Sequence, residues 1–241
     1  MSGFDETRWS ERGFSKDFRN SADEFILERA TLIRTAVSYY EFYIKDGLNK
    51  RILDLGCGDG IITNELILSD SNIEAVLIDA SVDMISAARE RLKGNKKIEF
   101  IESSLEGLLD GEKVTGEFDF VVSSLAIHHL EMADKRSLFN YIFGLLRHGG
   151  AFVNIDVVLG PTDTLDDWYL DMWSEWLGLR GVGAIGDEDT TFIKPKRCKD
   201  IPGNKPDTLA VQIEALKSAG FKEVDCFYKF GAFAVFGGKK G

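Results

Sequence analysis

The chain has 241 residues, of which 44% are hydrophobic and 29% are charged, an ordinary mix for one globular α/β domain. No apolar run approaches the roughly 18 residues that a membrane-spanning helix requires. The formal net charge of −11 repels nucleic acid, and the one compact basic cluster, from Lys194 to Lys199, follows an acidic run, so the charge favours a small-molecule partner over nucleic acid.

The start of the chain has neither the basic nor the apolar region of a secretory signal. The three cysteines, Cys57, Cys198 and Cys226, are scattered and form no close pair. This pattern fits a reducing compartment better than a disulfide framework or a zinc site. We therefore expect a cytoplasmic protein with no metal site and no membrane partner.

Residues 21 to 45 predict one long helix, in which Ser21 and Glu24 form a capping box and Gly47 follows the end. Short apolar runs then alternate with helical patterns. Strands are expected at residues 51–55, 74–79, 97–101, 118–123 and 151–158. Such alternation predicts a parallel sheet that is covered by helices on both faces.

The C-terminal part differs from this alternation. A helix capped by Asp207 or Thr208 precedes two strand-like runs, residues 223–228 and 232–237. The gap between these runs is too short for a crossover, so they should be antiparallel. We expect a single domain in which residues 1–48 form a helical cap and residues 159–206 form a lid or substrate insert rich in aromatic side chains.

The strongest motif runs from Ile52 to Gly60, where an apolar strand leads into glycines at positions 56, 58 and 60 and then into a helix. Glycines allow a sharp turn and a close approach to a ligand, and the helix N-terminus offers unpaired amides. The dinucleotide-binding pattern would require a further glycine at position 61, where this chain has Ile61.

Asp79 ends the second expected strand, roughly 20 residues after the first glycine of the motif. A carboxylate at this spacing is typical of sites that hold the two hydroxyls of a ribose. The alternative is a structural role at the start of the next helix.

Further motifs follow at Phe100 to Leu105, Phe118 to Leu125, Ala126 to Leu130 and Arg147 to Gly150. Together with the glycine motif and Asp79, they resemble the class I S-adenosylmethionine (SAM)-dependent methyltransferases of the small-molecule type. The resemblance implies a Rossmann-like sheet of seven strands, mostly parallel, with an antiparallel last strand. Ser104 and the missing proline before Gly149 depart from the usual family pattern.

The resemblance also implies which residues bind SAM. They come from the glycine motif, the ends of the next strands and the turns that follow: Asp54, Gly56, Cys57, Gly58, Gly60, Asp79, Ala80, Ser81, Met84, Ser103, Ser104, Leu105 and Ser123. Asp54 also suits the positive charge of the sulfonium. Met84 is a candidate to cover the adenine, or equally a core residue.

Three residues at the same sheet edge are candidates for acid–base work on an acceptor, namely His128, His129 and Asp156. Histidine titrates near neutrality, and ligands bind at the carboxyl ends of strands in such sheets. Each of the three has a structural alternative, such as a hydrogen bond to a loop carbonyl or a cap.

The sequence therefore predicts methyl transfer to a small molecule of unknown identity, by a chain for which a homodimer is an option. Two other functions stay open. One is a regulatory module that binds SAM without chemistry, and the other is a nicotinamide-dependent oxidoreductase. An N-terminal segment that carries Trp9, Phe14 and Phe18 is expected to fold over the cofactor.

Overall fold

The computed structural model describes residue 7, residue 9 and residues 14–47, 49–111, 114–179 and 197–241. The centre of the expected insert, residues 180–196, lies outside the described residues, and so do Lys194 and Lys196 of the basic cluster. Within the described part of the chain, no helix is both long and apolar enough to span a bilayer.

Seven strands form one sheet in the order β3-β2-β1-β4-β5-β7-β6. They are β1 (Arg51–Leu55), β2 (Glu74–Asp79), β3 (Ile98–Glu102), β4 (Phe118–Ser124), β5 (Leu146–Val157), β6 (Lys222–Phe230) and β7 (Phe233–Lys239). The pairs among β1 to β5 are parallel, and β7 runs antiparallel to both β5 and β6. The predicted sheet is confirmed, including its antiparallel member.

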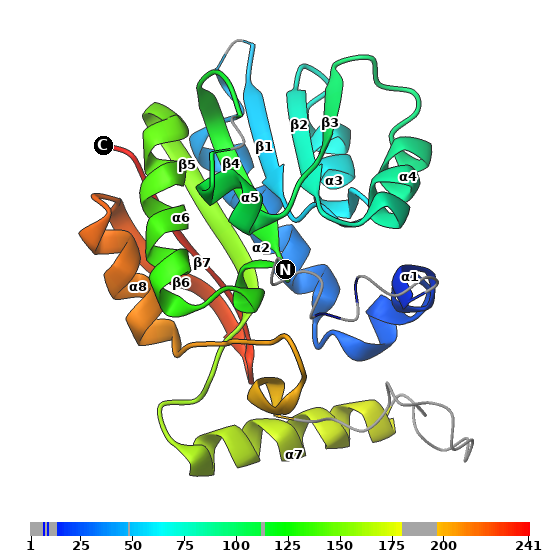
Figure 1. Ribbon diagram of the computed structural model, residues 1–241, viewed down its shortest axis with the longest axis vertical. Helices are drawn as coiled ribbons and strands as arrows, with labels where there is room; N and C mark the ends of the chain where they lie inside the picture. Colours follow the sequence, from blue (N-terminus) through cyan, green and yellow to red (C-terminus); the bar gives the residue numbers. More distant parts are fainter. Residues whose placement is uncertain (1–6, 8, 10–13, 48, 112–113, 180–196) are drawn as a thin grey trace.

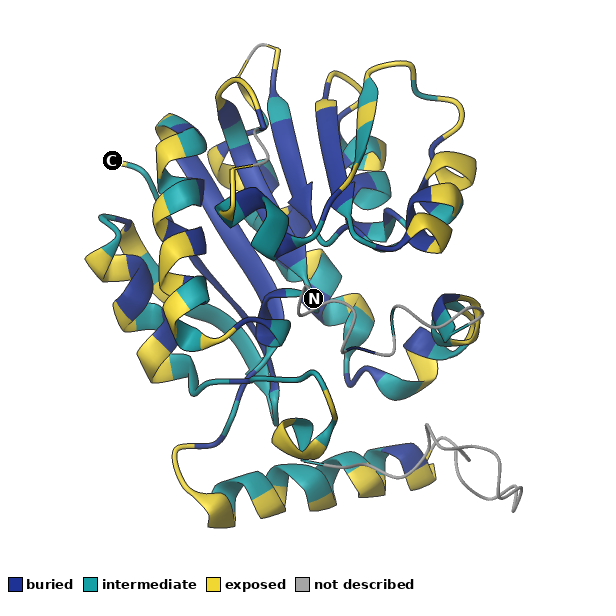
Figure 2. Cartoon of the chain, viewed as in Figure 1, coloured by how far each residue is buried: buried dark blue, intermediate teal, exposed yellow. Residues whose placement is uncertain are grey.

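Helices cover both faces of the sheet (Figure 1). On one face, α2 (Arg29–Tyr43), α3 (Ile61–Ser69) and α4 (Val82–Arg91) share a hydrophobic cluster with the strands. On the other face, α5 (Leu105–Leu109), α6 (Met132–Leu145) and α8 (Leu209–Ser218) share a second cluster. The central strands are almost wholly buried (Figure 2), as their continuous apolar sequences require.

Two helices lie apart from these layers, α1 (Phe14–Phe25) and α7 (Asp163–Leu179). In Figure 1, α7 crosses beneath the ends of β5 to β7, and α1 lies below α4. Short 3-10 turns, η3 (Ile127–His129) and η4 (Cys198–Asp200), complete the described elements near this edge. The carboxyl ends of the parallel strands thus face a region bounded by helices and loops.

The expected single helix over residues 21–45 is wrong. The chain forms α1 and α2 with a break at Ile26–Glu28, and Glu28 has a left-handed φ of 53°. Ser21 lies inside α1, so it does not cap a helix. Ile26 and Leu27 are only 4% and 1% exposed, and the bend buries both in the core. Burial of this apolar pair at the junction outweighs the local helical pattern.

Candidate active site

The glycine turn after β1 has the conformation that only glycine adopts readily. Gly56, Gly58 and Gly60 have φ values of +64°, +53° and +74°. A Cβ atom on Gly56 would overlap the Cβ of Ala126, which follows β4. Gly60 is the N-cap of α3. The alternate glycines therefore bring the backbone close to the neighbouring loop and direct the start of α3 towards the strand ends.

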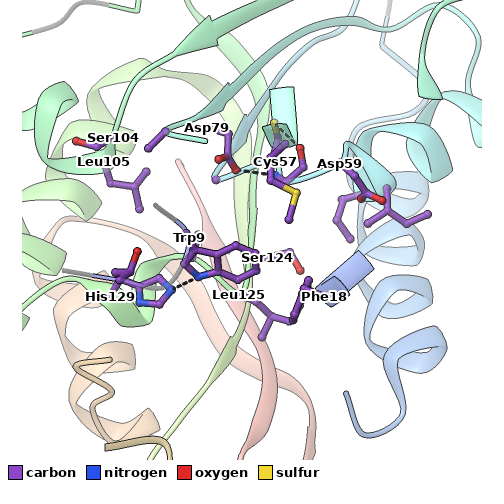
Figure 3. Close-up of a pocket in the computed structure, with 18 of the residues that line it drawn as sticks. Trp9, Phe18, Cys57, Asp59, Asp79, Ser104, Leu105, Ser124, Leu125 and His129 are labelled. Atoms are coloured by element: carbon purple, nitrogen blue, oxygen red, sulfur yellow. Dashed lines mark hydrogen bonds between the residues drawn. The ribbon is translucent and has the colours of Figure 1, made fainter. Parts of the chain in front are cut away.

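Asp79 holds this turn in place from the end of β2. Its Oδ2 accepts a hydrogen bond from the Gly58 amide and its Oδ1 accepts one from the Ser81 amide, each at 2.8 Å. Burial raises the pKa of the Asp79 carboxyl, while these two amides oppose that shift. Figure 3 shows Asp79 on the cavity wall opposite Trp9 and His129.

A first cavity of about 140 Å³ opens beside the glycine turn. Most of the predicted SAM-binding residues line it, namely Gly56, Cys57, Gly58, Asp79, Ala80, Met84, Ser103, Ser104 and Leu105. Burial raises the pKa of the Cys57 thiol well above its usual value, so this residue supplies shape and not a thiolate.

The other predicted SAM-binding residues lie outside the cavity lining and support it. The Asp54 carboxylate accepts a hydrogen bond from the Thr63 hydroxyl at 2.6 Å beneath the turn. Ser81 caps α4, and the Ser123 hydroxyl donates to the Leu55 carbonyl at 2.7 Å. Gly60 packs against the side chains of α4. These residues hold the two strands and the turn in register.

A second cavity of about 320 Å³ adjoins the first. The two share lining residues from the N-terminal segment and from the loop after β4: Thr7, Trp9, Phe18, Ile26, Leu125 and His129. The rest of its wall is mainly apolar and aromatic, with Tyr169 and Trp173 from α7. Cys198 also lines it, but burial raises the pKa of this thiol to about 12, so it stays protonated.

His128 and Asp156 form a buried pair on the wall of the second cavity. The Nδ1 of His128 lies 2.6 Å from Oδ1 of Asp156, and the two side chains are 9% and 0% exposed. The same oxygen accepts a hydrogen bond from the Val157 backbone amide at 2.9 Å, and Oδ2 accepts one from Nδ2 of Asn154 at 3.3 Å. An ionised carboxylate can only accept, so Nδ1 of His128 carries the proton and Nε2 offers its lone pair.

His129 uses both of its ring nitrogens in hydrogen bonds. The Trp9 indole donates to Nε2 at 3.1 Å, as Figure 3 shows, and Nδ1 donates to the Gly203 carbonyl at 3.0 Å. Burial and the adjacent His128 lower the pKa of His129 to about 3. This neutral ring therefore bridges the N-terminal segment and the loop before α8, on the wall that both cavities share.

Several cavity residues were not identified from the sequence, above all Arg19 of α1, Ile26 of the break and Arg29 of α2. Their positions follow from the bend between α1 and α2, for which the sequence carries no local signal. The expected approach of Trp9 and Phe18 is found, since both line the two cavities.

The geometry fits a nucleoside joined to an amino-acid tail. A Cβ atom on Gly58 would meet no atom within 4 Å, so the turn is open to a ligand there, and Asp79 stands at the adjoining strand end for a ribose. The oxygen Oδ1 of Asp54 is buried beneath the turn and has no hydrogen-bond partner among the described residues.

The family described as "Methyltransferase domain" matches residues 52–150, which span the glycine turn, Asp79 and the histidine pair. This match and the similar proteins below support a SAM-dependent methyltransferase of class I. SAM is the cofactor of this methyltransferase, and the glycine turn, Asp79 and the first cavity are the parts that fit it.

Similar proteins agree with this assignment. The carboxy-S-adenosyl-L-methionine synthase of Nautilia profundicola is 27% identical over 188 residues, which cover 77% of this chain and 75% of that protein. An O-methyltransferase family protein from Burkholderia thailandensis superposes with a TM-score of 0.63 at 15% identity, over 97% of this chain and 62% of its own. Human N-acetylserotonin methyltransferase, solved with SAM, superposes with a TM-score of 0.56 at 15% identity, over 100% of this chain and 64% of its own. The methyltransferase thus spans under two thirds of these two solved chains, whose likeness establishes the fold.

Proposed function

We propose that this chain transfers the methyl group of SAM to a small, largely apolar molecule that occupies the second cavity. The observation that carries the proposal is the shared wall of the two cavities, which places an apolar chamber directly beside the cofactor site. The N-terminal cap, residues 1–48, and the insert, residues 159–206, supply most of the chamber. The composition supports action in the cytoplasm.

The cofactor supplies an activated methyl group when it is bound, so the protein need not create a reactive species. The chain has three tasks: to align the acceptor, to exclude water and to take up a proton from the acceptor where one is present. The aromatic wall formed by Trp9, Phe14, Phe18 and Trp173 serves the first two tasks, because apolar contact area orients a ligand and displaces water.

In this proposal His128 is the base. Its Nε2 takes the proton of an acceptor hydroxyl while Asp156 holds Nδ1 and stabilises the imidazolium that forms. The two residues are buried together. His128 lies in η3, which follows β4, and Asp156 lies near the end of β5. His129 is assigned a bridging role, because both of its nitrogens are already used. This division separates two adjacent histidines that the sequence could not tell apart.

The Nautilia relative is named for the synthesis of a carboxylated form of SAM, which is a second candidate product. A carboxylate on the transferred carbon would need a cation near the shared wall. The described residues common to both cavities are uncharged, and His129 among them stays neutral above pH of about 3. The arginines of the lining, Arg19, Arg29 and Arg197, lie outside this shared wall. We therefore keep plain methyl transfer as the proposal and carboxymethyl chemistry as the alternative.

The test is the variant His128→Gln, with His148→Gln as a matched control because His148 is exposed on β5. Both proteins would be incubated with SAM and a panel of apolar phenols, alcohols and amines. Formation of S-adenosylhomocysteine and the mass of the methylated product would be followed against pH. We expect His128→Gln to lower kcat for hydroxyl acceptors by about 10²- to 10⁴-fold and to remove the acid limb of the pH profile.

The KM for SAM should stay the same in both variants, and His148→Gln should behave as the unmodified chain. If S-adenosylhomocysteine binds tightly but no acceptor is methylated, the chain is a SAM-binding module and the proposed transfer is wrong. An unchanged pH profile in His128→Gln would contradict only the assignment of His128 as the base, and the proposed methyl transfer would stand.

A further inference from the structure

The amide groups of the glycine turn are largely committed to the protein itself. The Gly58 amide donates to Asp79 at 2.8 Å, the Cys57 amide to the Ile78 carbonyl at 2.9 Å and the Gly60 amide to the Cys57 carbonyl at 2.9 Å. The methionine tail of SAM ends in a carboxylate, which is a strong acceptor. These three amides cannot satisfy it without loss of the bonds that shape the turn, so a charged donor elsewhere in the cavity would add to what the remaining amides offer.

The charged residues around the first cavity limit which side chain can bind the carboxylate of the methionine tail. Asp59, Asp79 and Glu106 are acidic, and the cations among the described lining residues are Arg19 and Arg29. The Arg19 guanidinium contacts the sulfur of Met84 at 3.7 Å, which places it over the start of α4, on the side of the cavity where Asp79 lies. Arg29 is the second cation of this lining, and among the described residues its hydrogen bond goes to α1 and not to α4.

Arg29 is the first residue of α2 and follows the bend at residues 26–28. Ile26, three residues earlier, packs in the same hydrophobic cluster as Cys57 of the turn and Ile62 of α3. The Arg29 side chain is only 19% exposed and lines the cavity. The bend therefore brings a mostly buried guanidinium to the wall of the cavity that the glycine turn and the start of α3 also line.

The present partner of Arg29 is weakly held. Its Nη1 donates to Asp23 Oδ1 at 2.6 Å, but the Asp23 side chain is 84% exposed. A carboxylate exposed to that degree gains little from an ion pair, because water solvates it almost as well. A ligand carboxylate inside the cavity would meet the same guanidinium with less competition from water.

We propose that Arg29 binds the carboxylate of the methionine tail of SAM, and that Asp23 holds the guanidinium in place until the cofactor enters. On binding, the guanidinium exchanges Asp23 for the ligand carboxylate, with no proton or bond transferred. The contact ties the N-terminus of α2 to the cofactor. The inference depends on the cofactor and not on the proposed acceptor chemistry.

The test compares two ligands that differ in the tail. S-adenosylhomocysteine has the carboxylate, whereas 5′-methylthioadenosine lacks the whole amino-acid portion. Calorimetry would measure the Kd of both for the unmodified chain, for Arg29→Met and for Arg34→Met. Arg34 is the matched control, because it lies on the same helix, is 67% exposed and pairs with Glu41.

We expect Arg29→Met to raise the Kd of S-adenosylhomocysteine about 10- to 100-fold and to change the Kd of 5′-methylthioadenosine by less than about twofold. A hydrogen bond to a charged group is lost only for the first ligand. Arg34→Met should change neither Kd. Asp23→Asn should lower the Kd of S-adenosylhomocysteine a few-fold, because it removes the competing carboxylate. A purely structural role of Arg29 would not produce this effect.

Equal weakening of both ligands by Arg29→Met, or no weakening of either, would overturn the proposal. Arg29→Lys, which keeps the charge but not the planar fork, would give an intermediate loss and serves if the methionine variant does not fold. Failure of the unmodified chain to bind either ligand would overturn the cofactor assignment itself, and with it this inference.

Discussion

Asp54 is wholly buried beneath the glycine turn and keeps one carboxylate oxygen, Oδ1, without a hydrogen-bond partner among the described residues. Burial raises its pKa to about 7, against the partial compensation of the Thr63 hydroxyl. A group that is so costly to bury gains nothing from packing alone. With a pKa of about 7, Asp54 carries a full negative charge beneath the turn only above neutral pH.

We predict that Asp54→Asn flattens the dependence of stability on pH. In the folded chain Asp54 holds a proton between about pH 4 and pH 7, whereas in the unfolded chain it releases it near pH 4, so its contribution to stability falls as pH rises through this window. The effect amounts to a few kcal/mol, at about 1.4 kcal/mol per pKa unit. Urea unfolding of the unliganded protein at several pH values measures it.

The control for this measurement is Asp46→Asn, because Asp46 is an exposed carboxylate that follows α2. It should leave the curve unchanged. If Asp54→Asn keeps the slope of the unmodified chain between pH 4 and pH 7, the buried carboxyl does not have the raised pKa described above.

At the scale of elements, His129 connects segments that are far apart in the sequence. Trp9 lies 120 residues before it and Gly203 lies 74 residues after it. A Cβ atom on Gly203 would come within 2.9 Å of Thr7, so the N-terminal segment and the loop before α8 also touch directly. Lys135, buried in α6, fixes the same loop through Asp207 and the Lys205 carbonyl. These contacts close the wall between the two cavities.

We predict that Trp9→Phe loosens this wall without altering the sheet. The buried Nε2 of His129 would lose its donor, which costs about 1–2 kcal/mol. S-adenosylhomocysteine should dissociate severalfold faster, as stopped-flow displacement would measure. Trp168→Phe is the matched control, because Trp168 is 56% exposed on α7. An unchanged dissociation rate in Trp9→Phe would show that the hydrogen bond does not retain the ligand.

At the scale of the whole molecule, the cofactor cavity is built by parts of the chain that fold around a common sheet edge. The glycine turn and the ends of β2, β3 and β4 form one side, and α1 with the N-terminus of α2 forms the other (Figure 1). A ligand that bridges these parts binds the folded state only, so it must stabilise the whole domain.

We predict that S-adenosylhomocysteine and SAM raise the thermal unfolding midpoint, whereas NAD does not. At a ligand concentration about 100 times the Kd, the added stability is about 2.7 kcal/mol. Differential scanning fluorimetry checks this directly. Stabilisation by NAD alone would contradict the cofactor site and would support an oxidoreductase.

Much of the fold could be predicted because its signals are local. The strands at 51–55 and 74–79 are found at the expected bounds, and Ser81 and Thr208 cap their helices as short-range patterns indicate. By contrast, β5 begins at Leu146, before the expected residue 151, because pairing with β4 extends it through a polar stretch. Pairing of this kind depends on a neighbouring strand that no local pattern reveals.

The sequence by itself determined the sheet, the glycine turn and the carboxylate at the end of β2, because steric limits on φ and the period of apolar residues act within a few residues. Only the tertiary structure decided that the N-terminal helices bend at Ile26, that Arg29 reaches the cofactor cavity and that His128 and His129 have different partners. Each of these depends on contacts between residues far apart in the chain. Burial of the apolar junction and satisfaction of buried polar groups select those contacts, and both act through space and not along the sequence.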